Sequence, residues 1–211
     1  MSSVPAWAVG VALILVEAGR SLPALWRVWK HRSSDGVSPE SLGVLAGTGL
    51  GWPVMAVLIG AWWVLAANIL WLILHLTWCA LVAWSSPAKR VRMVRSAALA
   101  AVALAVTVAI LNTRMGTADS LGLALGASAV LFCAPVLIEA MTSSTTRGLS
   151  TWTLAVNTCE GAIYLAAGIG LLAVSERATS VAGYTFFGVV SVIAWLPVLV
   201  RVLWRRAHQL E

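Results

Sequence analysis

Residues 21–38, SLPALWRVWKHRSSDGVS, leave an apolar run through a proline and a group of charged residues. Residues 133–150, CAPVLIEAMTSSTTRGLS, repeat this pattern with other residues between the shared positions. Pro23 and Pro135 are 112 residues apart, and the same offset relates Gly36 to Gly148, Ser38 to Ser150, and Gly49 to Gly161. Because these four identities need no gap, they indicate that one unit of sequence occurs twice in the chain.

The composition is that of a membrane protein. Of the 211 residues, 60% are hydrophobic and only 10% are charged, and the mean hydropathy is +0.91. Such a chain has too little polar surface to cover a soluble globule of this size. The net charge of +6 comes without a long basic run, so we expect the lipid bilayer and no nucleic acid as a partner. The three cysteines fall in apolar segments, where a thiol behaves as a small hydrophobe, and no cofactor or metal is expected.

Seven apolar blocks are long enough to cross a bilayer, which takes roughly 20 helical residues. They are residues 6–28, 39–60, 62–84, 96–113, 119–141, 150–173 and 181–203. The second and third blocks are divided only by Gly60 and by the pair Trp62 and Trp63, which suits the interfacial aromatic belt of a membrane protein. We therefore predict an all-α integral membrane protein with seven transmembrane helices.

The basic residues predict the orientation of the spans. Eleven of the 14 lie on one side of the predicted topology, namely Arg27, Lys30, Arg32, Lys89, Arg90, Arg92, Arg95, Arg147, Arg201, Arg205 and Arg206. The opposite loops hold only Arg114 and Arg177. Because cytoplasmic loops are enriched in basic residues, we expect a plasma-membrane protein with its N-terminus outside and its C-terminus in the cytoplasm.

The repeat divides the seven spans into three, one and three. A second copy displaced by three spans would be inverted, so a connector helix must separate the copies, and the apolar block 96–113 suits that role. We predict a first three-helix bundle in residues 1–88, a basic cytoplasmic loop with the connector in 89–117, and a second bundle in 118–211. Parallel repeats of this kind often place a substrate site at their interface, near the midplane.

The repeated pattern resembles that of the PQ-loop superfamily, and within it most closely that of the SWEET sugar transporters. It consists of a proline, a glycine 13 residues later and a serine two residues after that, at the exits of the first and fifth of seven spans. Ala24 and Val136 stand where other PQ-loop members have a glutamine after the proline. The resemblance implies alternating-access transport of a small sugar, with Pro23 and Pro135 as hinges.

The third predicted span supplies two candidate substrate ligands. Asn68 resembles the asparagine that this family presents to the sugar from its third helix, and it is the first candidate. His75 lies seven residues later on the same helical face. A lone histidine at this depth could equally be a packing residue or a ligand.

The sixth predicted span, with NTCEGAIYLAAG at residues 157–168, is the more distinctive. The resemblance puts Glu160 where a pocket asparagine is usual and Tyr164 where an aromatic platform is usual. At ~1.5 Å per residue Glu160 lies ~15 Å from the cytoplasmic start of its helix, near the midplane. It could donate to a hydroxyl when protonated, and pair with a cation or accept a transported proton when ionised. A structural hydrogen bond between helices is the alternative for Glu160 and for Asn157, one turn earlier.

Counterparts of these residues complete the predicted pocket. The 112-residue offset relates Glu160 to Thr48 and Tyr164 to Trp52. In the last span, Ser191 and Trp195 are the best counterparts of the third-span residues. Aromatic rings could cover the apolar faces of a sugar while polar groups hold its hydroxyls, although most tryptophans in apolar helices serve packing.

Three charged residues are candidate gates. Glu17 and Arg20 are three residues apart and can face each other on the first helix, either as a neutralised structural pair or as an extracellular gate. Glu139 lies near the cytoplasmic end of the fifth span, where it could snorkel to the interface or contact Arg27 as a cytoplasmic gate.

The leading functional prediction is uniport of a mono- or disaccharide. The main alternative is a proton-coupled PQ-loop transporter of an amino acid or another polar or cationic metabolite, with Glu160 carrying the proton. A peptide receptor of the KDEL-receptor type shares the architecture but would need more arginine in its helices.

No spacing typical of a catalytic triad or a metal site stands out, so we expect no enzyme. The expected partners are the sugar and the bilayer, and the chain could also form a homo-oligomer.

Overall fold

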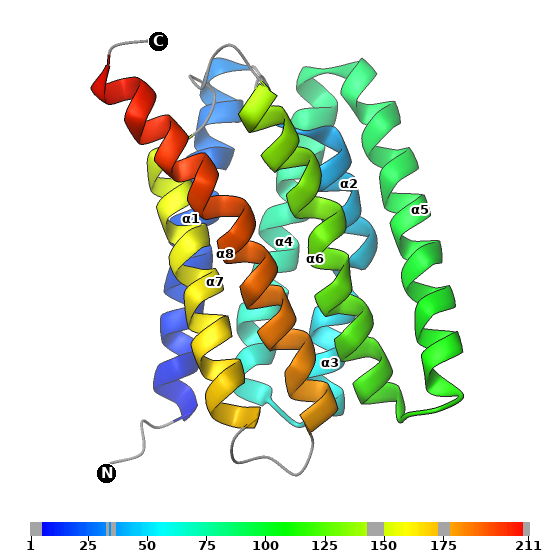
Figure 1. Ribbon diagram of the computed structural model, residues 1–211. Helices are drawn as coiled ribbons and strands as arrows, with labels where there is room; N and C mark the ends of the chain where they lie inside the picture. The colour runs from blue at the N-terminus through cyan, green and yellow to red at the C-terminus, as the bar shows by residue number, and fades with distance from the viewer. Residues whose placement is uncertain (1–5, 33, 35–36, 143–149, 173–177, 209–211) are drawn as a thin grey trace.

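The computed structural model is a bundle of long helices (Figure 1). It describes residues 6–32, 34, 37–142, 150–172 and 178–208, except for the side chains of 6–9, 31, 63, 139, 167–172, 178–182 and 184. Within these ranges the chain forms helices and no strand. The helices are α1 (Ala6–His31), α2 (Pro39–Thr48), α3 (Gly51–Leu58), α4 (Trp62–Ser85), α5 (Pro87–Asn112), α6 (Thr117–Thr142), α7 (Thr151–Leu172) and α8 (Ala178–Ala207).

Length and composition of the helices support a multi-pass membrane protein. Among the described residues, five stretches are long and apolar enough to cross a bilayer, and they are Pro39–Leu58, Val64–Ser85, Pro87–Asn112, Thr117–Thr142 and Thr185–Ala207. The first of these joins α2 and α3, which the sequence predicts as one span. Large apolar side chains such as Leu15, Val102 and Ile110 face outward, as a lipid-facing surface requires. The all-helical prediction is confirmed.

The repeated serines begin two corresponding helices. Ser38 precedes α2, and its hydroxyl oxygen accepts a hydrogen bond from the Ser41 amide at 3.3 Å. Ser150 precedes α7, and its hydroxyl accepts from the Thr153 amide at the same distance. A helix start leaves backbone amides without helical partners, and a serine in this position satisfies one of them. Both copies of the repeat therefore keep their serine for the same local reason.

The connector helix α5 is longer than the sequence predicts. Residues 89–95 were expected in a basic loop, but α5 already begins at Pro87. Proline suits the first position of a helix, and no glycine or proline interrupts the chain from there to Asn112. The basic residues therefore occupy the first turns of α5.

Side chains in the first turns of α5 bind Ser34 and Val37, which lie between α1 and α2, and Glu40 at the start of α2. The Lys89 ammonium donates to the carbonyl oxygen of Ser34 at 2.5 Å and to that of Val37 at 3.2 Å. Arg92 pairs with Glu40 in the first turn of α2 at 2.6 Å. Two of the basic residues of α5 thus bind residues that lie before α2 or in its first turn.

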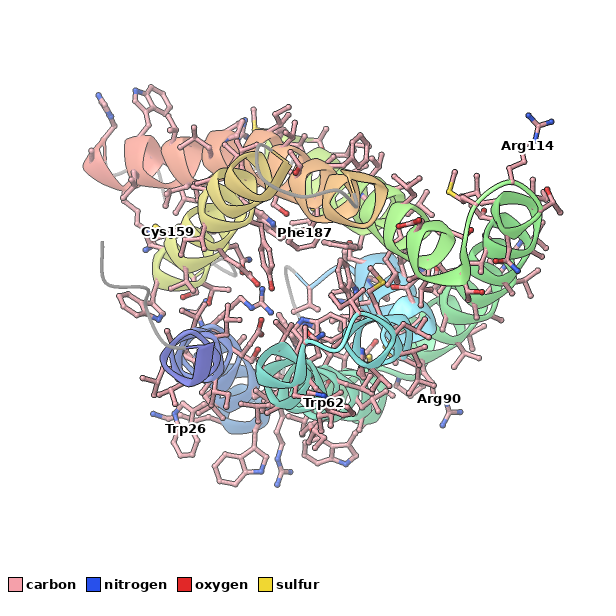
Figure 2. The ribbon with its side chains drawn as sticks, turned by 90° about the horizontal axis from the view of Figure 1, so that it is seen from below. Trp26, Trp62, Arg90, Arg114, Cys159 and Phe187 are labelled. Atoms are coloured by element: carbon pink, nitrogen blue, oxygen red, sulfur yellow. The ribbon has the colours of Figure 1, made fainter. Side chains whose placement is uncertain are left out.

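The helices pack in the same order in the two halves of the chain. In the first half, α4 packs against α1 and against α2 and α3; in the second, α8 packs against α6 and α7. The halves meet along two seams, α1 with α7 and α2 with α6. Helix α5 lies beside this ring, mainly against α2 and also against α6 and α4. Figure 2 shows the ring from one end, with Trp26 and Trp62 pointing outward and Phe187 pointing into its centre.

Close packing between α2 and α5 depends on glycine. Gly43, Gly47 and Gly51 recur at four-residue spacing, which predicts one closely packed face, and the first two of them face α5 while Gly51 meets Leu125 of α6. A Cβ atom on Gly43 would overlap the carbonyl oxygen of Met93, and one on Gly47 would overlap that of Ala97. The backbones of α2 and α5 are therefore in contact, and the predicted close approach is confirmed.

We expect Gly47→Ala to destabilise the protein by about 1–3 kcal/mol, because a methyl group here meets backbone atoms that cannot move aside. Thermal unfolding of the purified protein in detergent measures the effect. Gly19→Ala is the matched control, since a Cβ on Gly19 has nothing within 4 Å, and alanine favours a helix over glycine. Equal melting temperatures for the two variants would contradict the packing assignment.

Candidate functional site

A cavity of about 190 Å³ lies within the ring of helices. One water needs only ~10–15 Å³ measured in this way, so the cavity can hold several waters or a small solute. Its walls come from α1, α2, α3, α4, α6, α7 and α8. Ten of the predicted site residues line it, namely Glu17, Arg20, Trp52, Asn68, His75, Asn157, Glu160, Tyr164, Ser191 and Trp195.

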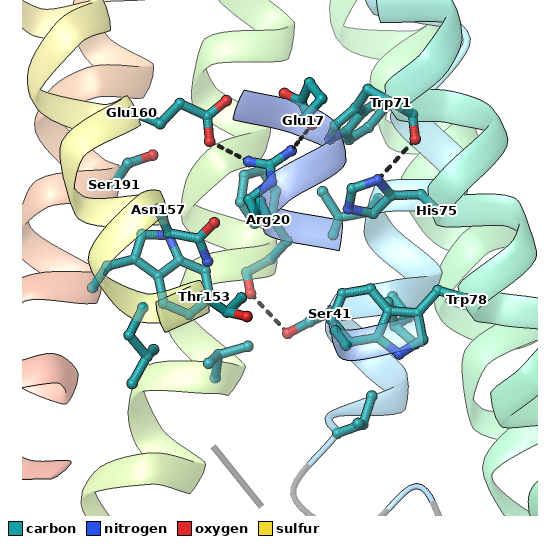
Figure 3. Close-up of a pocket in the computed structure, with 18 of the residues that line it drawn as sticks. Glu17, Arg20, Ser41, Trp71, His75, Trp78, Thr153, Asn157, Glu160 and Ser191 are labelled. Atoms are coloured by element: carbon teal, nitrogen blue, oxygen red, sulfur yellow. Dashed lines mark hydrogen bonds and ion pairs between the residues drawn. The ribbon is translucent and has the colours of Figure 1, made fainter. Parts of the chain in front are cut away.

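One face of α7 forms a polar wall of the cavity. Thr153, Asn157, Glu160 and Tyr164 follow one another at spacings of four, three and four residues, which places them along one side of a helix. Asn157 Oδ1 and Thr153 Oγ1 are buried and have no hydrogen-bond partner among the described residues. The same holds for Ser191 Oγ on α8 (Figure 3). Buried polar atoms are costly unless they are paired, so the cavity contents are their natural partners.

One face of α4 forms the opposite wall, with Asn68, Trp71, His75 and Trp78 at spacings of three, four and three residues. The Asn68 amide nitrogen donates to the Trp52 carbonyl oxygen at 3.0 Å, so part of this first candidate ligand is engaged within the protein. His75 Nδ1 lies 2.9 Å from the Trp71 carbonyl oxygen. Because a carbonyl only accepts, Nδ1 carries the hydrogen.

An ion triad joins α1 to α7. The Arg20 guanidinium donates to Glu17, three residues earlier, and also to Glu160, 140 residues later. The three side chains are only 8–12% exposed (Figure 3). The predicted pair of Glu17 and Arg20 is confirmed, whereas the bond to Glu160 was not foreseen, because no local spacing relates residues so far apart. With both carboxylates ionised the triad has a net charge of −1.

An aromatic layer lies beside the triad. The Phe187 ring makes edge contacts with Trp52 and Tyr164, with centroids 5.5 and 5.2 Å away, and it lies 6.1 Å from Phe132. Tyr164 is one turn beyond Glu160, so the layer covers the end of the cavity away from the start of α7. Phe187 was missed from the sequence, since a phenylalanine in an apolar helix gives no signal that separates a cavity wall from packing.

Equivalent positions of the repeat line the cavity together. Eight pairs related by the 112-residue offset contribute both members, and they are Arg20 and Phe132, Ala24 and Val136, Ser38 and Ser150, Ser41 and Thr153, Leu42 and Leu154, Leu45 and Asn157, Trp52 and Tyr164, and His75 and Phe187. The cavity is thus lined by corresponding positions of both copies.

The remaining predicted residues lie elsewhere. Thr48 is buried but does not line the cavity, because its hydroxyl donates to the Val44 carbonyl of its own helix at 2.9 Å. Pro23 and Pro135 lie inside α1 and α6 without lining the cavity. The side chain of Glu139 lies outside the described residues, and so do the repeat positions Gly36 and Gly148.

No protein-family model, curated protein or solved structure matches this chain.

Among substitutions that replace one charged residue of the triad by glutamine, we expect Arg20→Gln to be the most destabilising. It leaves two buried carboxylates without a cation. Loss of one partner of a buried ion pair typically costs about 3–5 kcal/mol. Glu17→Gln and Glu160→Gln should cost less, since each leaves one carboxylate for one guanidinium. Thermal unfolding of the three variants in detergent ranks them.

Arg92→Gln is the control for this series, because it breaks the exposed pair with Glu40, and exposed pairs are worth only about 0–1 kcal/mol. If Glu160→Gln lowered the melting temperature as much as Arg20→Gln, the charge balance described for the triad would be wrong.

Proposed function

We propose that this chain is a seven-span plasma-membrane transporter that moves a mono- or disaccharide by alternating access. The three-one-three arrangement is part of the proposal. Its support is the shared packing order of the two halves, together with the lengths of α1 and α7, whose 26 and 22 residues extend over ~39 and ~33 Å at 1.5 Å per residue. The positive-inside tendency adds an outside N-terminus and a cytoplasmic C-terminus.

The observation that carries the proposal is the cavity between the halves, lined by equivalent positions of both. A pathway that opens alternately to either side needs two similar elements facing one site, and parallel repeats supply them. The predicted span starts Ser38 and Ser150 both line the cavity, so it extends to the end from which α2 and α7 begin. The aromatic layer around Phe187 covers the other end.

The cavity chemistry suits a sugar. Four buried polar atoms of the cavity lining have no hydrogen-bond partner among the described residues, and they are on Asn157, Thr153, Ser191 and Trp78. They could accept hydrogen bonds from the hydroxyl groups of a sugar or donate to them. Trp71 and Trp195 line the same space, and their rings could cover the apolar C–H faces of a sugar ring. Because Asn68 already donates to Trp52, Asn157 becomes the first candidate for a hydroxyl ligand.

Counterflow of labelled glucose into proteoliposomes loaded with unlabelled glucose tests this function. We expect the parent to accumulate label and Asn157→Ala to reduce the initial rate about tenfold, because a solute hydroxyl loses one buried acceptor. Asn112→Ala makes the same chemical change at an exposed residue of α5 and should keep the parent rate. If the parent transported neither glucose nor a disaccharide, the sugar proposal would fall.

The charge of the triad favours one second candidate, which is proton-coupled transport of an amino acid or another cationic metabolite. Two carboxylates share one guanidinium, so one proton or one monovalent cation would neutralise the group. The other ionisable residues that line the cavity are Arg27, His75 and Tyr164. In this mechanism Glu160 releases Arg20 when it accepts the proton, and the α1–α7 seam loses its ion pair.

For this second candidate we expect an imposed proton gradient to drive accumulation of labelled lysine by the parent. Glu160→Gln should still exchange lysine across the membrane without a gradient, but it should lose the accumulation that the gradient drives. Glu40→Gln, at the ion pair outside the cavity, is the matched control. Accumulation that is unchanged in Glu160→Gln would exclude this residue as the proton carrier.

A further inference from the structure

Each repeat has a proline inside its first helix, and each proline removes a backbone donor. A proline at position i leaves the carbonyl of residue i−4 without its helical partner and crowds the preceding turn. The carbonyls concerned are those of Gly19 before Pro23 in α1 and Leu131 before Pro135 in α6. In hydrocarbon an unpaired backbone carbonyl destabilises the fold. A hydrogen-bond donor from another helix therefore stabilises the proline turn.

The freed carbonyl of α1 is paired from the other half of the chain. Trp152, in the first turn of α7, donates its indole N–H to the Gly19 carbonyl oxygen at 3.0 Å. Gly19 is the residue whose carbonyl loses its partner to Pro23. The indole therefore restores the hydrogen bond that the proline removed, and it does so across the α1–α7 seam.

The corresponding turn of α6 also receives a hydrogen bond from the other half of the chain, at the carbonyl next to the freed one. Ser41, in the first turn of α2, donates its hydroxyl to the Phe132 carbonyl oxygen at 2.7 Å. Phe132 is the residue after Leu131 and three before Pro135, in the turn that the proline disturbs. This bond crosses the other seam, between α2 and α6.

The two bonds are reciprocal. In both cases the acceptor belongs to the proline turn of one repeat, and the donor belongs to the first turn of the second helix of the other repeat. They are made by different side chains, because Ser41 corresponds to Thr153, whose hydroxyl has no hydrogen-bond partner among the described residues. On that side the donor is the indole N–H of the neighbouring Trp152.

We propose that Ser41 and Trp152 are positioning residues that hold the proline turns of the opposite repeat. Each bond lies across one of the two seams where the halves meet, so the halves cannot separate near the starts of α2 and α7 while both bonds persist. As far as it concerns transport, this inference rests on the proposed alternation between the halves. The bonds themselves can be tested without any substrate.

Hydrogen–deuterium exchange of the full chain in lipid nanodiscs, read by mass spectrometry, tests the proposal. Trp152→Phe removes the indole donor but keeps an aromatic ring, and we expect amides in residues 20–27 of α1 to exchange about fivefold faster, as loss of one neutral hydrogen bond implies. Amides in residues 132–138 should keep the parent rate. Ser41→Ala should produce the reverse pattern, with faster exchange in 132–138 alone.

Three controls separate this positioning role from general loosening. Ser41→Thr retains the hydroxyl and should restore the parent rate in α6. Thr153→Val changes the residue next to Trp152 and should alter neither proline turn. Trp26→Phe removes another exposed indole, on α1 itself, and should leave residues 20–27 unchanged.

Faster exchange confined to the substituted helix, or no change in the opposite proline turn, would overturn the proposal. If one variant did not fold, the other would still decide the matter, because each seam is read by its own donor. If glucose counterflow failed but the crossed exchange pattern was observed, the sugar transporter would be refuted and the positioning role of Ser41 and Trp152 would stand. Glucose counterflow without the crossed exchange pattern would support the sugar transporter and refute the positioning role of Ser41 and Trp152.

Discussion

A polar side chain on a membrane-spanning helix has to face protein or enclosed water, and in the proposed seven-span arrangement this constraint accounts for the place of the cavity. Charged groups at bilayer depth are costly and turn toward the interior of the bundle. Glu160, Asn157 and Thr153 all lie on one face of α7, and Glu17 and Arg20 lie on the face of α1 that meets it. Other faces of the same helices expose apolar residues such as Leu15 and Ile163.

The repeat gives the two halves similar geometry but different chemistry. Eight pairs of positions related by the repeat offset line the cavity, yet Leu45 corresponds to Asn157 and Phe132 corresponds to Arg20. Thr48 satisfies its hydroxyl within α2, whereas the equivalent Glu160 has to find a partner on α1. The second half therefore carries most of the unpaired polar atoms, and a solute in the cavity would be held unequally by the two sides.

Local features of the site could be predicted from the sequence, and long-range ones could not. Helical spacing was enough to pair Glu17 with Arg20, and the repeat offset was enough to bring Trp52 and Tyr164 to one cavity. The bond from Arg20 to Glu160 depends on how α1 meets α7, which no sequence period determines. Asn68 was ranked above Asn157 by resemblance, whereas the structure engages the Asn68 amide and leaves Asn157 Oδ1 unpaired. The early start of α5 was missed because charge was taken to indicate a loop, although Pro87 is a good helix start.

The two seams between the halves differ in strength, and this difference limits how the halves can move. The α1–α7 seam holds the charge-assisted bond from Arg20 to Glu160 and the indole bond of Trp152. The α2–α6 seam holds the neutral hydroxyl bond of Ser41, and α3 adds the close contact of Gly51 with Leu125 of α6. Bonds to charged groups are roughly twice as strong as neutral ones, and burial strengthens them further. If the halves rock against each other, the α2–α6 seam therefore opens at lower cost, and α1 and α7 remain joined until a proton or a competing ion releases Arg20.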